Sequence, residues 1–177
     1  MNKVIPFPSK NEYPEYAEMY MKFLKKDGSL LKQMEESLIK GKRFMTSIPS
    51  VKLDYRYMPN KWSVKEVLIH IIDDERIYAY RAMAFARNDK TELPGFEETE
   101  YVKYANANTR SIQSIVTEYE AVRRATIALF ESFSEEALQR IGMANRNKTS
   151  VRALGYHIVG HELHHFYVIR EKYLNNM

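Results

Sequence analysis

The chain has 177 residues, of which 45% are hydrophobic and 28% are charged, and its formal net charge is +4. We expect a single domain over residues 1–177, long enough to bury a core. The absence of cysteine excludes disulfides, thiolate ligands and cysteine nucleophiles, and it favours a cytoplasmic location. Acidic and basic residues alternate, which argues against a nucleic-acid partner. No stretch reaches the roughly 20 apolar residues of a membrane span, and the first residues hold no signal peptide.

The first third of the chain predicts two helices and a loop. A short helix is expected over residues 14–25, because Pro14 suits a first helical position. Apolar residues recur at helical spacing over residues 30–45, and this second helix ends before Pro49. Residues 50–60 are expected to form a loop.

The middle of the chain opens with a strong start signal. Ser63 and Glu66 form a capping box, in which each side chain bonds the other residue's backbone N–H. The helix that follows runs to about Arg87. Residues 88–100 contain a Pro-Gly pair and are expected to form a loop that ends in a short helical turn.

The last third predicts a long helix, a short helix and a terminal helix. The long helix covers residues 109–133, and the short one covers 134–140. Residues 142–148 are expected to form a loop, after which Thr149 or Ser150 caps a helix to about Leu174. Four long helices with short connections indicate an all-α fold, a four-helix bundle with small additional helices in its connections.

All the histidines lie in two of these helices. They are His70, His157, His161, His164 and His165. His157 with His161, and His161 with His165, have the one-turn spacing at which two imidazoles can share a metal ion. His157 and His165 lie about 12 Å apart by helix rise, too far to bind one ion together. His161 belongs to both pairs and is therefore the strongest candidate ligand.

Residues 161–165 also match the H-E-x-x-H pattern of zinc peptidases, in which Glu162 would be the general base. Such peptidases take a third ligand from a downstream segment. Here Glu171 is the only acidic residue after His165, and it faces another side of the helix. His70 is the alternative third ligand, although a lone histidine on an apolar helix is more often a hydrogen-bonded core residue.

Carboxylates follow His70 on the same helix. Asp74 is four residues further on and shares the face of His70, where it would orient an imidazole, hold a water or act as a fourth ligand. An ordinary salt bridge with Arg76 or Arg81 is the simpler interpretation. For Glu75 we favour that simpler interpretation.

Two motifs resemble the DinB/YfiT-like superfamily. The stretch from Lys61 to His70 resembles its second-helix motif, and Gly160–His165 resembles its last-helix motif. The similarity spans about residues 13–174. The resemblance implies a four-helix bundle that binds one divalent metal, zinc or nickel, through His70, His161 and His165. It also implies a homodimer.

The same resemblance implies two activities, thiol S-transfer with a low-molecular-weight thiol and metal-dependent hydrolysis. Our leading hypothesis is a thiol S-transferase that conjugates a small thiol to electrophiles in detoxification. The second is a hydrolase that uses a metal-bound hydroxide, and the third is a non-enzymatic metal-binding stress-response module. The sequence does not select the metal, because three imidazoles suit zinc, nickel, copper and iron.

A substrate pocket would be built from the loops at residues 50–60 and 88–100. Tyr55, Tyr57, Trp62 and Phe96 are candidates to line it, and packing is the alternative role of each. The roles of His157 and His164 remain open.

Overall fold

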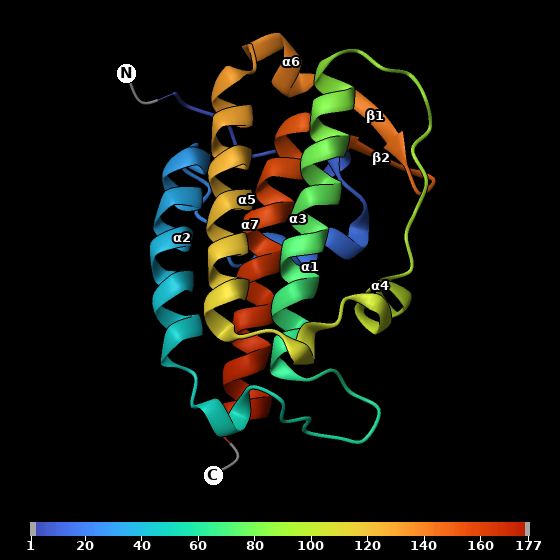
Figure 1. Cartoon of the computed structure of the whole chain (residues 1–177). Helices are drawn as coiled ribbons and strands as arrows, with labels where there is room; N and C mark the ends of the chain where they lie inside the picture. The colour runs from blue at the N-terminus through green and yellow to red at the C-terminus, as the bar shows by residue number, and fades with distance from the viewer. Residues whose placement is uncertain (1–2, 176–177) are drawn as a thin grey trace.

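The computed structural model describes residues 3–175, and four long helices form its frame (Figure 1). They are α2 (Leu30–Ser47), α3 (Val64–Ala86), α5 (Ile112–Ser132) and α7 (Val151–Val168). The pairs that pack along each other are α2 with α5, α5 with α3, α3 with α7 and α7 with α2. The helices therefore surround one core in the order α2, α5, α3, α7, which confirms the predicted all-α four-helix bundle.

The connections are longer than we expected, and the helix directions explain why. Helices α3 and α5 are neighbours that run the same way, so residues 87–111 must return along the length of the bundle (Figure 1). Helix α4 (Glu98–Tyr104) lies in this return. The other two connections, residues 48–63 and 133–150, link helices that sit diagonally across the bundle. The prediction of short connections is therefore wrong.

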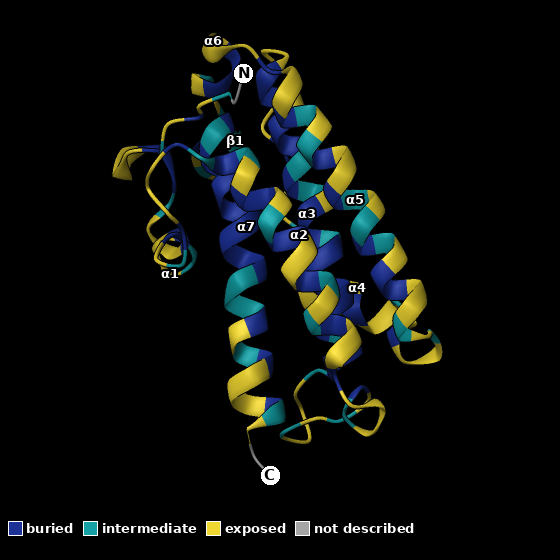
Figure 2. Ribbon diagram, turned by 90° about the vertical axis from the view of Figure 1, so that its left-hand side faces the viewer, coloured by how far each residue is buried: buried dark blue, intermediate teal, exposed yellow. Residues whose placement is uncertain are grey.

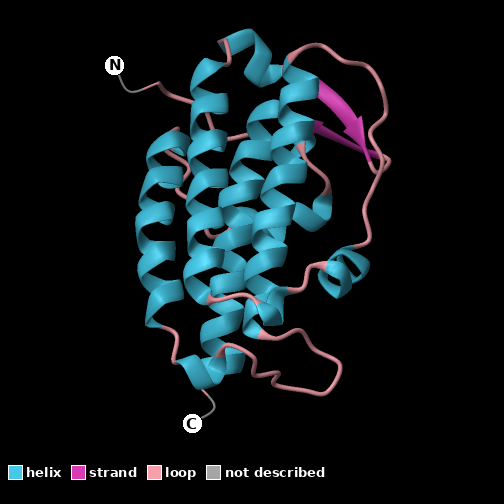
Figure 3. Cartoon of the chain, in the orientation of Figure 1, coloured by secondary structure: helices cyan, strands magenta, loops and turns pink. Residues whose placement is uncertain are grey.

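The short elements lie in the N-terminal segment, in the connections and directly after α7 (Figure 3). They are 3-10 turns at Lys10–Glu12, Glu15–Ala17, Ser50–Lys52 and Ala107–Thr109, helices α1 (Glu18–Met21) and α6 (Glu135–Gln139), and a π turn at Ile169–Leu174. The helix expected over residues 14–25 is thus reduced to two short turns. Short helices depend on tertiary packing for stability, and α1 packs mainly against α7.

A β-hairpin replaces the loop that was expected at residues 142–148. Strands β1 (Ile141–Ala144) and β2 (Asn147–Ser150) pair antiparallel, with Ala144 opposite Asn147. The two turn residues, Asn145 and Arg146, both have positive φ values, 47° and 62°. A two-residue hairpin turn requires this conformation, and glycine normally signals it. The signal was missed because asparagine and arginine occupy these positions.

Serine caps fix where α3 and α7 begin. The Ser63 hydroxyl accepts a hydrogen bond from the Glu66 backbone N–H, and the Glu66 carboxylate accepts one from the Ser63 backbone N–H, so the predicted capping box is confirmed. Ser150, and not Thr149, caps α7 by accepting from the Ala153 backbone. Because these caps set the helix starts, they also set the rotation of α3 and α7, on which all the histidines lie.

The apolar core consists of two clusters, one toward each end of the bundle. Helix α7 is buried over its first turns, and exposed residues appear only toward its C-terminal end (Figure 2). No helix within residues 3–175 is both long enough and apolar enough to cross a membrane.

Candidate metal centre

A layer of buried polar side chains separates the two apolar clusters. Its members come from all four long helices and are Ser37, His70, Asp74, Glu75, Arg123, His157, His161 and Glu162. Burying a polar group costs free energy unless that group has a partner. A polar group of this layer that is paired within the protein therefore supports the fold, whereas a group without such a partner is a candidate to bind a ligand.

Two histidines of the polar layer, His70 and His161, converge on one point with the partly buried His165. The Nε2 atom of His161 lies 3.1 Å from Nε2 of His70 and 3.0 Å from Nε2 of His165. His70 and His161 are each only 3% exposed, and His165 is partly buried. Within residues 3–175, this is the only group of three ligand-type side chains whose ligand atoms all lie within 4.8 Å. The structure thus brings together the three residues proposed as ligands.

The spacing of these nitrogen atoms fits a shared ion. Two imidazoles on a tetrahedral zinc ion, each at about 2.0–2.1 Å, would place their nitrogens about 3.3 Å apart. The observed 3.0 and 3.1 Å lie close to that value. Asp74 Oδ2 lies 3.4 Å from Nδ1 of His161, which favours a proton on Nδ1 and leaves the Nε2 lone pair free. Of the three roles considered for Asp74, its position supports the orientation of an imidazole.

The surroundings keep the three rings neutral. Burial lowers the pKa of His70, and it lowers the pKa values of His161 and His165 well below their usual range. The neighbouring histidines lower the last two pKa values further. Neutral imidazole is the form that binds metal, so the trio is prepared for a cation without losing protons.

Aromatic rings enclose the trio. The indole of Trp62 lies 4.8 Å from the ring of His70, and Tyr20 of the N-terminal segment packs edge-on at 5.2 Å from His161. Tyr20 reaches this position because residue 160 is glycine. A Cβ atom at Gly160 would lie 2.6 Å from the Tyr20 carbonyl oxygen. The glycine of the last-helix motif therefore lets α1 close over the histidines.

The other two histidines of α7 lie outside the trio. His157 stacks on Tyr78, with ring centroids 3.8 Å apart and planes 2° apart. Its Nε2 atom lies 3.5 Å from Asp74 Oδ2. His164 is partly buried and packs against Tyr20 and Phe23. Helical spacing cannot predict these neighbours, because they lie on other segments of the chain.

Glu162 faces the opposite side of α7 and belongs to an ion-pair network. It bonds the guanidinium of Arg123 and the hydroxyl of Tyr119, at 3.0 Å from the latter. Arg123 also holds Glu75 through two bonds of 2.8 Å and donates to Ser37. Glu75 therefore pairs with Arg123, and the prediction of a salt bridge within its own helix is wrong. Glu162 is engaged in the core and is not positioned as a general base.

The charges of this network are fully buried. Arg123 and Glu162 are each 0% exposed. Burial alone would lower the pKa of Arg123, but Glu162 and Glu75 outweigh it and raise that pKa well above its usual range. Burial raises the pKa of Glu162, which Arg123 and Tyr119 only partly oppose.

The aromatic residues proposed for a pocket divide into two groups. Tyr55 and Tyr57 pack edge-on against Tyr173, at 6.4 and 4.8 Å, and so serve the core. Phe96 lines a small polar cavity that reaches His161, together with residues that the sequence analysis did not single out. Among these, Tyr20 comes from the N-terminal segment and Glu98 and Asn145 from two separate connections, and no motif marked them.

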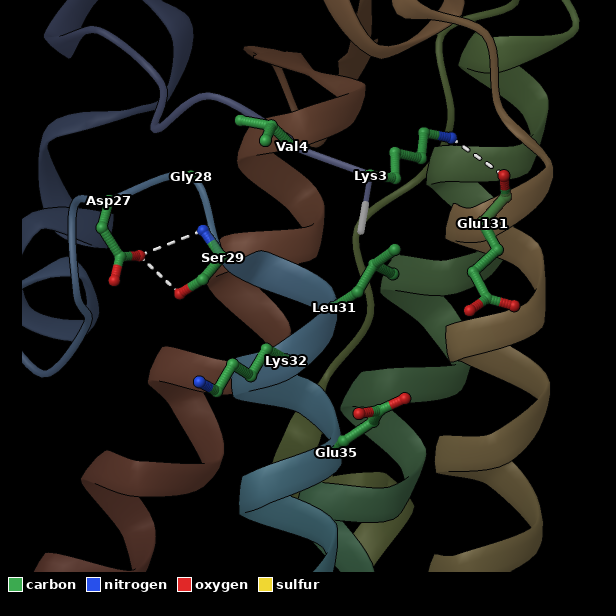
Figure 4. Close-up of a pocket in the computed structure, with 9 residues that line it drawn as sticks. All are labelled: Lys3, Val4, Asp27, Gly28, Ser29, Leu31, Lys32, Glu35 and Glu131. Atoms are coloured by element: carbon green, nitrogen blue, oxygen red, sulfur yellow. Dashed lines mark hydrogen bonds between the residues drawn. The ribbon is translucent and has the colours of Figure 1, made fainter. Parts of the chain in front are cut away.

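A larger hollow lies elsewhere, between the N-terminal segment and α2 (Figure 4). Its volume is about 600 Å³, and it shares no lining residue with the histidine trio. Two of its charged side chains already have partners. Asp27 accepts from the Ser29 backbone at 3.0 Å, and Lys3 donates to the carbonyls of Phe130 and Glu131, both at 2.9 Å.

Comparison with known proteins identifies the family. The model of the DinB superfamily matches residues 42–169, which include all three converging histidines. The chain belongs to the DinB superfamily. This confirms the family that the two sequence motifs indicated.

A solved structure supports the fold of this DinB-superfamily protein. YfiT from Bacillus subtilis, described as a probable metal-dependent hydrolase with an unusual four-helix bundle topology, is 16% identical and has a TM-score of 0.68. The likeness covers 94% of this chain and 91% of that chain. At this identity the likeness shows the fold alone. No curated protein matches the DinB-superfamily chain.

Proposed function

We propose that this DinB-superfamily protein is an enzyme that uses one divalent metal ion, zinc or nickel, held by His70, His161 and His165. The observation that carries the proposal is the convergence of three neutral Nε2 atoms on one point. Neutral ligands leave the full double charge of an ion in place, and three protein ligands leave coordination positions open. When bound, such an ion supplies a Lewis acid that favours the deprotonated form of a thiol or water.

We further propose that the reaction is thiol S-transfer. The chain has no cysteine, so the sulfur must come from a cosubstrate. Glu162, next to His161 in sequence, is paired with Arg123, and Asp74 lies on the Nδ1 side of His161, away from the Nε2 atoms. A thiol, with a pKa of about 8.5, needs far less help to ionise than water, with a pKa of 15.7. Thiol activation therefore suits a site without a dedicated base.

In this reaction the thiol proton is released to solvent and the sulfur forms a new bond to an electrophilic carbon. The leaving group departs from that carbon with the bonding electron pair, so no oxidant or reductant is needed. The aromatic rings of Trp62 and Tyr20 exclude water from the histidines, which strengthens electrostatic interactions within the site.

The test combines metal analysis with a conjugation assay. The purified protein is expected to bind one divalent ion per chain and to conjugate a generic electrophile to at least one of several small thiols. His165→Ala is expected to lose both properties, and His164→Ala, which changes the neighbouring histidine outside the trio, is expected to retain them. A metal-loaded protein that conjugates none of the thiols would refute S-transfer.

Hydrolysis is the second candidate, and the description of YfiT as a probable metal-dependent hydrolase favours it. It predicts turnover of small esters or amides in the absence of thiol. Measuring thiol consumption against product formation separates the two activities, because only S-transfer consumes one thiol per product.

A further inference from the structure

A small polar cavity lies on the Nδ1 side of His161, behind the proposed metal position. Its volume is about 120 Å³. Asp74, His157 and His161 form its buried part, and Tyr16, Glu98 and Asn145 are exposed residues at its margin. Tyr20, Tyr78, Arg81 and Phe96 complete the lining. We call this the Asp74 cavity.

Two buried polar atoms in the Asp74 cavity have no hydrogen-bond partner. They are Asp74 Oδ2 and His157 Nε2, on side chains that are 3% and 4% exposed. They lie 3.5 Å apart, beyond the usual 2.7–3.2 Å of a hydrogen bond. Asp74 Oδ2 also lies 3.4 Å from Nδ1 of His161, again beyond that range, so the two buried atoms can accept hydrogen bonds from a ligand.

The balance of charge in the Asp74 cavity favours a cation. Two carboxylates, Asp74 and Glu98, and one guanidinium, Arg81, line it together with the imidazoles of His157 and His161. Arg81 is already engaged, because its Nη2 atom donates to the Pro94 carbonyl at 2.9 Å and its guanidinium lies 5.0 Å from the ring of Tyr78.

Neighbouring groups respond to the same negative potential. Burial, with the Asp74 and Glu98 carboxylates as further causes, raises the pKa of Tyr20 to about 12. Desolvation and the Asp74 carboxylate also raise the pKa of Glu98. The cavity would therefore attract positive charge and repel negative charge.

The geometry does not favour a second metal ion. Among the described residues, the histidine trio is the only group of three ligand-type side chains with ligand atoms within 4.8 Å of one another. An ammonium group differs from a bare metal ion because it has three N–H donors, and its nitrogen lies farther from the acceptor atoms than a metal ion lies from its ligands. Its donors match the acceptors that line the cavity, namely Asp74 Oδ2, His157 Nε2 and the Glu98 carboxylate.

We propose that the Asp74 cavity binds a primary ammonium group, which Asp74 and Glu98 neutralise and His157 helps to orient. The volume, about that of four water molecules, accepts the ammonium end of a larger molecule or a small free amine. Binding here does not depend on the proposed reaction, because it is measured without turnover.

The test is an NMR titration of the full-length, zinc-loaded protein, following the ring signals of Tyr78 and His157. The probe is ethylammonium, with ethanol as its neutral counterpart and acetate as its anionic counterpart. Ethylammonium is expected to shift both rings saturably, whereas the other two are not. Equal shifts by all three probes would show a cavity filled by water only and would overturn the proposal.

Variants show which carboxylate contributes to ethylammonium binding. Glu98→Gln is expected to weaken ethylammonium binding about fivefold, as for loss of one partly screened ion pair. Glu97→Gln is the matched control, since Glu97 is its exposed neighbour and does not line the cavity. Asp74→Asn, with zinc content verified, is expected to weaken binding more than Glu98→Gln. Equal effects of Glu98→Gln and Glu97→Gln would contradict the proposal.

A last comparison distinguishes the two sources of ammonium. Cysteamine carries both an ammonium group and a thiol. Tighter binding of cysteamine than of ethylammonium, lost in His165→Ala, would assign the ammonium group to a thiol cosubstrate that reaches the metal. Equal binding of the two would assign the cavity to a free amine.

Discussion

Helix α7 carries two polar clusters on opposite sides at the same level of the bundle, and they differ in how their members are paired. On one side, Arg123 meets the carboxylates of Glu75 and Glu162, so opposite charges face one another. On the other, three imidazoles of the histidine trio turn their Nε2 atoms toward a common point. Both clusters are buried, but only the second presents like groups to one another.

This difference separates a structural role from a ligand-binding role. The ion-pair network satisfies its own charges and needs nothing from outside, so its loss should appear as lost stability. The three Nε2 atoms of the histidine trio face one another as like groups, without an opposite charge among them, so replacing one of these histidines should appear as lost ligand binding. The adjacent residues His161 and Glu162 therefore belong to different functions, although one sequence motif contains both.

The largest expected effect is on the ion-pair network. Arg123→Met leaves two buried carboxylates without their cation and is expected to lower the free energy of unfolding by about 3–5 kcal/mol. Urea denaturation measures this change. Arg124→Met is the matched control, because the neighbouring Arg124 pairs with Glu120 at the surface and should change stability little. Equal losses in the two variants would show that the buried network is not structural.

The next effect is on metal binding. His165→Ala removes one of three ligands and is expected to weaken metal affinity more than about 100-fold, since even changes behind the ligands cost about 10–100-fold. Competition with a chelator measures the affinity, and His164→Ala is the control. The stability of the metal-free protein should change little. If the variant instead loses thermal stability in proportion to its loss of bound metal, the result would support a purely structural metal in a non-enzymatic module.

A smaller effect is expected at the cover of the histidine trio. Gly160→Ala places a methyl group against the Tyr20 carbonyl oxygen and should cost about 1–3 kcal/mol. Faster amide exchange in α1, with little change in α5, would locate the disturbance on the histidine side. In the control, Gly95→Ala, the new methyl group meets only the flexible side chain of Asn145. Unchanged exchange in α1 would show that the close approach is not needed.

The smallest effect is a dependence of stability on pH. Burial lowers the folded-state pKa of His70, His161 and His165, so below the unfolded value of about 6.5 the unfolded chain binds more protons. Stability of the metal-free protein should therefore fall as pH decreases below about 6.5, by at most about 1.4 kcal/mol per pH unit for each histidine.

Denaturation at pH 7.5, 6.5 and 5.5 measures this slope. The His70→Gln variant should have a shallower slope, and the difference between it and the parent chain removes the opposing contribution of Glu162, whose folded-state pKa is raised. Identical slopes would show that His70 is not held neutral by the fold.

The sequence predicted what local rules control. The capping box at Ser63, the start of α7 and the four long helices follow from periodicity and capping, which involve only nearby residues. The hairpin was missed because its turn lacks glycine, and the direction of the connections was missed because it depends on which helices are neighbours. The pairing of Glu75 with Arg123 could not be read from the chain, because these residues are 48 positions apart.

For the candidate metal centre, the sequence by itself selected His70, His161 and His165, since helical spacing puts two of them on one face and the family motifs supply the third. Only the tertiary structure decided that the three rings meet, because that depends on the packing of α3 against α7. It also decided that Asp74 lies behind His161, and that Glu162 points to Arg123. Adjacent positions on a helix lie about 100° apart, so the neighbouring helices determine what each of them contacts.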